Sequence, residues 1–353
     1  MSTDNGTSAR WALAGYGAGG RTFHRPLIES AAGLDLVAVV TGSSERQAQV
    51  RAEIPGATPV AALAELVDLD VQGVTITTPS ATHADLAHQA LDLGLHVVVD
   101  KPFALTARAS ADLVEHAART GLVVTAYQNR RWDSDLLTLR ALIAGGLLGA
   151  VHRFTSRIDR FRPVKGSWHG GTVEQGGGTL LDLGPHLIDQ ALLLFGPVEA
   201  VHSELRTLRD GAGADDEIEL HLRHAGGVNS TLAAGMASAA PGPRFQVNGS
   251  LGGFVIDGFD VQEEDLKSGA SPASLGDGWG VEPESAWGLL YTADGSRRVP
   301  SERGRWDTYY PAVARAVTGR GLPPVDPRDA VATAVVIDAA RESAATDSVI
   351  RLG

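Results

Sequence analysis

Short apolar runs rich in β-branched residues alternate with helical stretches over the first third of the 353-residue chain. The runs are almost continuously apolar, which is typical of strands covered on both faces of a parallel sheet. They predict strands at Trp11–Ala14, Leu36–Thr41, Gly73–Thr77, His96–Val99 and Leu122–Thr125. The stretches between them predict helices at Gly19–Ser30, Ser44–Glu53, Ala61–Leu66, Ala84–Leu93 and Ala107–Arg119. This alternation predicts an α/β domain with a doubly wound parallel sheet over residues 1–128.

The pattern changes after about residue 129. One helix is predicted at Ser134–Ala144, and then apolar and polar residues alternate, which favours a mostly antiparallel sheet with one open face. The predicted strands are Val151–Arg160, Ala200–Leu208, Glu217–Arg223, Val228–Gly235, Arg244–Asn248 and Gly252–Asp257. Closing helices follow at Trp306–Thr318 and Pro327–Ser343, and Lys267–Gly280 is interpreted as a surface loop. We expect a second α/β domain over residues 129–353, whose open sheet face contacts another subunit.

Composition and charge narrow the function classes. The absence of cysteine excludes disulfides, thiolate metal ligands and a cysteine nucleophile. The net charge of −12 argues against nucleic-acid and anionic membrane partners, because both would repel the chain. Met1–Arg10 has no signal-peptide core, and no run approaches the roughly 18 apolar residues of a membrane span, so we expect a cytoplasmic protein. No metal site is predicted, because His221 and His224 point to opposite faces of one strand.

A glycine-rich loop directly follows the first predicted strand. It reads Gly15-Tyr16-Gly17-Ala18-Gly19-Gly20 and opens the first predicted helix. A G-x-G-x-x-G pattern gains its meaning from this strand–helix context. The first glycine permits the tight turn, the second lets a pyrophosphate approach the backbone, and the third allows close packing of helix and strand. The loop therefore predicts a dinucleotide site at a helix N-terminus.

The end of the second predicted strand bears on the choice of cofactor. Enzymes that use NAD usually carry an acidic residue there, but the position falls near Thr41, and Asp35 lies at the strand's other end. The following loop offers Ser43, Ser44 and Arg46, whose groups suit a 2′-phosphate. We therefore favour NADP, with NAD as the alternative. The other interpretation of Ser43 is that it caps the next helix.

Two further loops follow the carboxyl ends of predicted strands, where ligands of such sheets bind. After the fourth strand come Thr78, Pro79 and His83, which we expect to contact the dinucleotide. After the fifth come Asp100 and Lys101, followed by a proline that restricts the turn. A partly desolvated ammonium at this place can bind a substrate oxygen and help to transfer a proton. The alternative is an ordinary surface lysine on a strand–helix loop.

A triple glycine in the second half leads into a cluster of titratable residues. In one continuous helix, Asp182, His186 and Asp189 would fall on one face. Alternatively, Pro185 starts the helix and Asp182 lies just ahead of it. Either arrangement keeps a carboxylate near an imidazole, and a histidine oriented in this way can exchange a proton near neutral pH.

Together, Gly15–Gly20, Asp100-Lys101-Pro102 and Gly176–Asp189 resemble the glucose–fructose oxidoreductase, inositol dehydrogenase and MocA (Gfo/Idh/MocA) family over nearly the whole chain. Segments Gly19–Ile28 and Gln128–Asp133 are most similar to a branch that includes NADP-dependent scyllo-inositol dehydrogenases. The resemblance implies a Rossmann domain followed by an open-faced sheet that forms homodimers or homotetramers. It also implies that Lys101 hydrogen-bonds the reacting oxygen, that His186 exchanges its proton, and that Asp182 positions both.

The chain departs from the family pattern at two places. Asp100 stands where glutamate is usual, and Trp168-His169 stands where many members have Trp-Arg. The missing guanidinium predicts a pocket less suited to a charged substrate. Arg131 and Trp168 are candidates for gripping a polyol, although either could instead lie in the domain interface.

These observations predict an NAD(P)-dependent oxidoreductase that interconverts a secondary alcohol and a ketone on a small sugar or cyclitol. One alternative is a reductase of a non-carbohydrate carbonyl or an imine. Another is a regulatory protein that binds a dinucleotide or sugar without turnover. The presence of Lys101, Asp182 and His186 together favours catalysis, because a sensor needs none of them.

Overall fold

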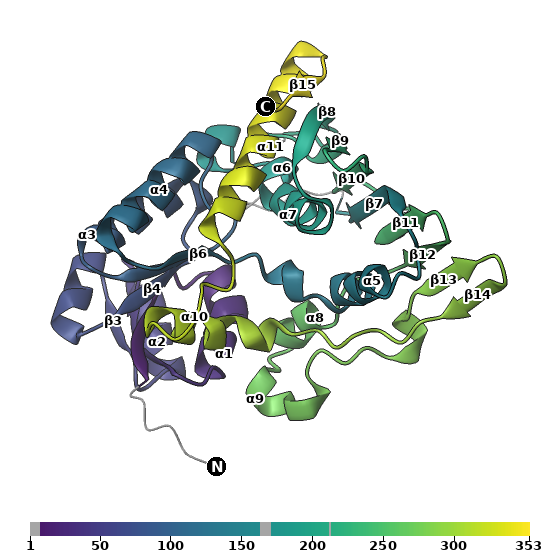
Figure 1. Ribbon diagram of the computed structural model, residues 1–353. Helices are drawn as coiled ribbons and strands as arrows, with labels where there is room; N and C mark the ends of the chain where they lie inside the picture. The colour runs from purple at the N-terminus through teal and green to yellow at the C-terminus, as the bar shows by residue number, and fades with distance from the viewer. Residues whose placement is uncertain (1–7, 163–170, 212) are drawn as a thin grey trace.

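The computed structural model describes residues 8–162, 171–211 and 213–353. The chain forms two halves, each built on its own sheet, and the long C-terminal helix α11 (Pro327–Thr346) packs against both (Figure 1). The fold class is the predicted one, a parallel sheet with crossover helices followed by a mostly antiparallel sheet. Within the described ranges, every helix is too short or too polar to cross a bilayer.

The first sheet has six parallel strands in the order β3-β2-β1-β4-β5-β6. The strands are β1 (Ala9–Ala14), β2 (Leu34–Val40), β3 (Thr58–Val60), β4 (Gly73–Ile76), β5 (His96–Val99) and β6 (Val124–Ala126). The crossover helices are α1 (Arg25–Glu29), α2 (Ser44–Glu53), α3 (His83–Asp92) and α4 (Ala107–Thr120). The central strands are buried on both faces, as their continuous apolar runs predicted. The strand order reverses between β1 and β4, which opens a crevice at their carboxyl ends.

Two predicted helices of this half have a different geometry. Gly19–Ser30 is not one α-helix: a six-residue π-helical turn, η1 (Gly19–His24), precedes α1. The segment predicted at Ala61–Leu66 is a 3₁₀ helix, η2 (Leu63–Leu69). Strand β3 was not predicted, because its three residues include a proline and give no usable periodicity.

The second sheet has nine strands in the order β14-β13-β12-β11-β7-β10-β9-β8-β15. They are β7 (Val151–Asp159), β8 (Val198–Arg206), β9 (Glu217–His224), β10 (Asn229–Gly235), β11 (Phe245–Gly249), β12 (Gly252–Ile256), β13 (Leu289–Thr292), β14 (Gly295–Arg298) and β15 (Ile350–Arg351). Only β7 and β10 pair in parallel; the other neighbours are antiparallel. The alternation along β9 buries one side of the strand and leaves polar and charged residues on the other.

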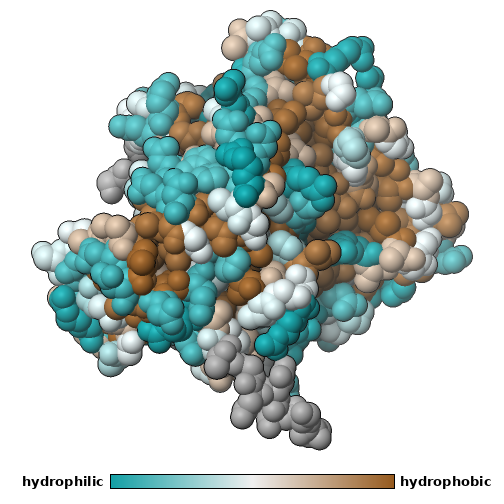
Figure 2. Space-filling model, turned by 60° about the vertical axis from the view of Figure 1, so that its left-hand side comes forward, coloured by the Kyte–Doolittle hydropathy of each residue, from teal (hydrophilic) through white to brown (hydrophobic). Residues whose placement is uncertain are grey.

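Helices cover one face of this sheet. They are α5 (Ser134–Ala144), α6 (Thr179–Asp182), α7 (Gly184–Phe195) and α11. Figure 2 shows that apolar side chains gather in one large area of the surface it presents, whereas polar side chains cover most of the remainder. The partly buried apolar residues that pack on this core from the helical side include Ile143 and Leu192–Phe195. The segment interpreted as a loop, Lys267–Gly280, contains the short helix α9 (Pro272–Leu275) after α8 (Gln262–Lys267).

A late segment of the chain returns to the first sheet. Helix α10 (Tyr309–Val317) buries both of its tyrosines in the core of that sheet, and the Tyr309 hydroxyl donates a hydrogen bond to the carbonyl oxygen of Ala126 at 2.8 Å. The two halves of the structure therefore do not correspond to two consecutive parts of the chain, because α10 packs in the core of the first sheet. The division at residues 1–128 and 129–353 stays a prediction.

Candidate functional site

The glycine loop lies at the crevice between β1 and β4. Gly15 has a φ of +96°, and a Cβ there would lie 2.9 Å from the backbone of Thr77. A Cβ on Gly20 would lie 2.2 Å from the carbonyl oxygen of Gly15. By contrast, a Cβ on Gly17 would meet, within the described part of the chain, only the Arg46 side chain, at 4.0 Å. Two glycines thus close the turn, and the third leaves open space where a phosphate group fits.

The residues around this loop divide into those that face the open space and those that do not. Ala18 is exposed, whereas Tyr16 is buried and its hydroxyl donates to Glu53 Oε2 at 2.8 Å. Burial and this contact raise the pKa of Tyr16 to about 12. Ser43 caps α2 by accepting from the Arg46 backbone N–H at 3.3 Å, which is the alternative interpretation given above.

Of the three residues expected to hold a 2′-phosphate, Arg46 is the one whose side chain reaches the glycine loop. Ser44 is exposed in the first turn of α2. Its hydroxyl lies on the same turn as the Arg46 backbone, so it remains a candidate ligand. The guanidinium provides the positive charge that a phosphate requires.

Lys101 reaches across the molecule to the second half. Its Nζ donates to Asp182 Oδ1 at 2.7 Å and to the Asp182 carbonyl oxygen at 2.8 Å. Both side chains are less than a fifth exposed, at 18% and 14%. The preceding carboxylate, Asp100 Oδ2, lies 3.6 Å from the position of a Cβ on Gly19. The structure therefore places the ammonium between the glycine loop and the helix pair α6–α7.

His186 lies in the first turn of α7, beside this contact. Helix α6 ends at Asp182 and α7 begins at Gly184 with Pro185 next, so the second of the two predicted arrangements is present. His186 is 5% exposed, and its Nδ1 is buried without a hydrogen-bond partner in the described part of the chain. Burial, followed by the nearby charge of Lys101 and three arginines, lowers the pKa of His186 well below its ordinary value. The imidazole is therefore neutral near pH 7.

Helix α6 is fixed by a residue that sequence reasoning did not find. The Asp215 carboxylate accepts from the Leu180 N–H at 2.7 Å, and its carbonyl oxygen accepts from the Thr179 N–H at 2.9 Å. A Cβ on Gly178 would lie 2.5 Å from Asp215 Oδ1, so this glycine allows the close approach. No motif marks Asp215, because its role depends on a loop that meets α6 only in the folded chain.

Asp100 contacts a second buried histidine. His24 Nε2 lies 3.4 Å from Asp100 Oδ2, and His24 Nδ1 lies 2.6 Å from the hydroxyl of Tyr310. Burial by itself raises the pKa of Asp100, but His24 and Lys101 outweigh burial and lower it. The shorter acid is thus held as a carboxylate behind the lysine. His24 lies in the segment Gly19–Ile28 that carried the resemblance, but no role was predicted for it.

His83 joins the two loops that carry predicted site residues. Its Nδ1 lies 2.8 Å from the carbonyl oxygen of Pro102, and its Nε2 lies 2.8 Å from that of Thr78. The ring is almost completely buried, and Pro79 beside it is exposed. His83 therefore positions the loops behind Lys101, and its ring nitrogens are occupied by backbone contacts.

The Arg131 guanidinium is held by two carboxylates other than Asp182. It forms two hydrogen bonds to Asp189, at 2.8 and 2.6 Å, and a third to Asp329 at 2.9 Å. These bonds join η4 (Asn129–Trp132) to α7 and α11, so the interface interpretation of Arg131 fits its contacts better than a substrate role. The Asp189 carboxylate is bound to this guanidinium and therefore belongs to the same interface. Trp168 lies outside the described residues.

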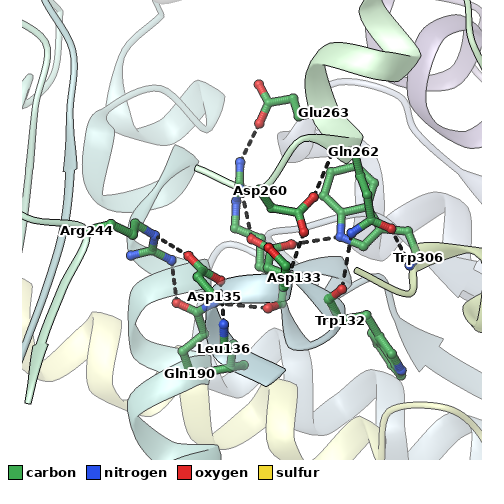
Figure 3. A network of polar contacts seen from close by, with 12 residues as sticks. Trp132, Asp133, Asp135, Leu136, Gln190, Arg244, Asp260, Gln262, Glu263 and Trp306 are labelled. Atoms are coloured by element: carbon green, nitrogen blue, oxygen red, sulfur yellow. Dashed lines mark hydrogen bonds and ion pairs between the residues drawn. The ribbon is translucent and has the colours of Figure 1, made fainter. Parts of the chain in front are cut away.

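A network of buried charges connects η4, α5 and α8 next to the site (Figure 3). Arg130 pairs with Asp133 at 3.0 Å and with Glu263 at 2.5 Å. Asp133 also accepts from the Trp306 indole N–H at 2.7 Å, and Asp260 lies close to it. Nowhere in residues 8–162, 171–211 and 213–353 do three or more histidine or acidic side chains form a group that could hold a metal ion.

Comparisons with known proteins identify the family of the chain. Residues 9–128 match the family model described as an oxidoreductase family with an NAD-binding Rossmann fold, and residues 136–255 match the GFO/IDH/MocA C-terminal domain. The chain belongs to the Gfo/Idh/MocA oxidoreductase family. The Gfo/Idh/MocA resemblance predicted from the motifs is therefore confirmed.

Several relatives match the chain almost from end to end. The uncharacterized oxidoreductase YdgJ of Escherichia coli is 38% identical over 95% of this chain and 96% of its own length. The scyllo-inositol 2-dehydrogenase (NADP(+)) IolW of Bacillus subtilis is 33% identical over 96% and 95%. The solved structure of the oxidoreductase yvaA from Bacillus subtilis superimposes with a TM-score of 0.92 at 31% identity, covering 98% of this chain and 99% of that one.

Proposed function

We propose that this Gfo/Idh/MocA protein is an NADP-dependent dehydrogenase or reductase that interconverts a secondary alcohol and a ketone on a small sugar or cyclitol. The observation that carries the proposal is the contact of Lys101 Nζ with Asp182, at 2.7 Å, beside the neutral imidazole of His186. These groups come from the two halves of the chain and meet next to the glycine loop. A sensor that only binds its ligand has no need for such a set.

The residues present fit a dinucleotide. The open space over Gly17 and the backbone at the start of η1 would hold the pyrophosphate, and Arg46 would hold a 2′-phosphate. The nicotinamide ring, when bound, accepts or supplies the hydride at its C4 carbon. Thr78 and Pro79 on the neighbouring loop are candidates to line the same crevice. The relative IolW is named as an NADP(+) enzyme, which supports NADP over NAD.

The side chains divide the proton chemistry between them. The Lys101 ammonium hydrogen-bonds the substrate oxygen and stabilises the negative charge that develops on it as the alcohol is oxidised. Neutral His186 takes up the hydroxyl proton and returns it in the reverse reaction. Asp182 holds Lys101 through two hydrogen bonds, so the ammonium is oriented before substrate binds.

A lysine replacement tests this proposal. Lys101→Met removes the ammonium but keeps a side chain of similar length, and we expect at least a 1,000-fold loss of turnover with unchanged NADPH binding. Arg108→Met is the control, because Arg108 is an exposed cation on α4 outside the proposed catalytic set. The assay uses inositols, aldoses and ketoses with NADP and with NAD. Unchanged turnover in Lys101→Met would remove the lysine from the mechanism.

We also propose that the chain forms a homodimer or homotetramer through the second sheet. Supporting this is the asymmetry of the sheet, whose helices lie on one face only in the described part of the chain. A sheet of nine strands offers a broad surface for a second copy. Sedimentation at micromolar concentration checks the assembly, and a monomer would contradict it.

A further inference from the structure

The row of side chains on the helix-facing side of β7 ends in an arginine. Phe154, Ser156 and Ile158 are completely buried, and every second residue of a strand faces the same side. Arg160 is the next member of this row, directly after the strand ends. A cation at the end of a core-facing row needs a physical explanation, because burying a charge costs free energy unless the charge is paired.

The backbone fixes Arg160 in this position. Its N–H donates to the carbonyl oxygen of Gly235 at 2.8 Å, and its own carbonyl accepts from the Ser238 N–H at 3.0 Å. The side chain is 22% exposed. Its Nη2 lies 3.8 Å from Glu263, the carboxylate that also pairs with Arg130, so Arg160 joins the buried charge network beside the proposed catalytic groups. In agreement with this position, its charge contributes to lowering the pKa of His186.

The described residues provide little negative charge for this guanidinium. Among them, Arg160 forms an ion pair with Glu263, at a long 3.8 Å. Glu263 already contacts Arg130 at 2.5 Å and Lys267 at 2.7 Å. Burial opposes ionisation of Glu263, but these three cations, Arg130 first, lower its pKa to about 2. Arg130 and Lys267 each have a second carboxylate, Asp133 and Glu264, whereas among the described ion pairs Arg160 has only this long contact with Glu263.

Two of the other arginines nearby, Arg130 and Arg131, differ from Arg160 in this respect, whereas burial also lowers the pKa of Arg244. Asp133 and Glu263 more than offset the burial of Arg130, and its pKa is raised. Arg131 has Asp189 and Asp329, and its pKa is raised too. For Arg160, burial outweighs the nearby carboxylates and the pKa is lowered. The guanidinium is desolvated without full compensation, which is the condition in which an incoming anion binds well.

We propose that Arg160 binds an oxyanion of the substrate, so that the enzyme acts on a polyol or sugar carrying a carboxylate or a phosphate group. This inference rests on the proposed function and names its substrate class. It also revises the expectation, drawn from the sequence at His169, of a pocket less suited to a charged substrate. Lys101 and His186 would act on a hydroxyl or carbonyl group, while Arg160 holds the charged end.

Matched pairs of substrates test the proposal. Reaction with NADP is measured for D-glucuronate against D-glucose and for a myo-inositol monophosphate against myo-inositol, as kcat/KM. We expect the wild type to prefer at least one charged member by tenfold or more, and the pair that shows the preference distinguishes carboxylate from phosphate. Arg160→Gln should reduce that preference at least tenfold, mainly through KM, and Arg160→Lys should retain part of it.

Arg108→Gln is the control, because Arg108 lies on α4, away from the second sheet, and its side chain is 91% exposed. It should keep the wild-type preference. The same preference in Arg160→Gln as in the wild type, or no preference in the wild type, would overturn the proposal while leaving the oxidoreductase function standing. If NADPH binds but no compound reacts, the proposed function fails instead. Calorimetric binding of the acids to the NADP-loaded wild type and Arg160→Gln then still decides whether the subsite exists.

Discussion

Substitution of Gly17 by alanine should weaken cofactor binding without lowering the stability of the fold. The Gly17 backbone is outside the left-handed region, and an added Cβ would meet only the Arg46 side chain at 4.0 Å among the described atoms. Alanine at a compatible glycine position stabilises a fold by about 0.4–1 kcal/mol, since it restricts the unfolded chain. We therefore expect Gly17→Ala to unfold at the same or a slightly higher urea concentration than the wild type.

The same methyl group would occupy the space in which the pyrophosphate should lie. If it displaces one charge-assisted hydrogen bond between a backbone N–H and a phosphate oxygen, the loss is about 1.5–3 kcal/mol. At about 1.4 kcal/mol per factor of ten, the Kd for NADPH rises roughly 10- to 150-fold. Fluorescence titration with NADPH measures this change directly.

Two other glycine variants complete the experiment. Gly56→Ala is the control, because Gly56 is exposed on the turn after α2 and a Cβ there meets nothing within 4 Å among the described atoms. Gly20→Ala should behave in the opposite way and lower stability, because its Cβ would lie 2.2 Å from the carbonyl oxygen of Gly15. A Gly17→Ala protein that is stable and binds NADPH as tightly as the wild type would refute the placement of the cofactor.

Four further outcomes follow from named contacts. Arg46→Ala should weaken NADPH binding by roughly 10-fold or more, from the loss of about 1.5–3 kcal/mol, and NADH binding by less than threefold; equal losses in titrations would argue against a 2′-phosphate site. Asp189→Asn breaks the buried pair with Arg131 and should lower the free energy of unfolding by about 3 kcal/mol, measured in urea, with little effect on KM. Because the pKa of His186 is lowered, kcat/KM for oxidation should not fall as pH decreases through about 6.5, the ordinary value. Arg160→Gln removes one of the cations that lower this pKa, so its acidic limb should move to higher pH, and an unmoved limb would show that the two side chains do not interact.

Much of the fold could be predicted where a single pattern determined the element. The periodicity and capping of Ser44–Glu53 and Ser134–Ala144 gave both helices with their observed bounds. Strand β14 was missed because all four of its residues are exposed, and an edge strand without a buried face has no apolar alternation to detect. The π-helical start at η1 was missed because propensity does not distinguish a π-turn from an α-helix.

Only the site residues that belong to sequence motifs could be predicted. The resemblance identified Lys101 and Asp182 as partners, and the structure places them 2.7 Å apart. The contacts of Asp215 and Glu263 lie outside any motif, since each depends on segments that meet only through the tertiary fold. The alternation of the predicted strand Val151–Arg160 already places Arg160 on the core-facing side, which marks it as a candidate site residue.

The return of α10 to the first sheet has a mechanical consequence. The polypeptide passes between the two sheets at η4, again before α10, and once more on the way to α11. Several connections restrict the relative motion of the two halves more than a single connection would. We therefore expect a fragment cut at residue 128 to be less stable than the whole chain, because Tyr309 and Tyr310 would be absent from the core of its sheet.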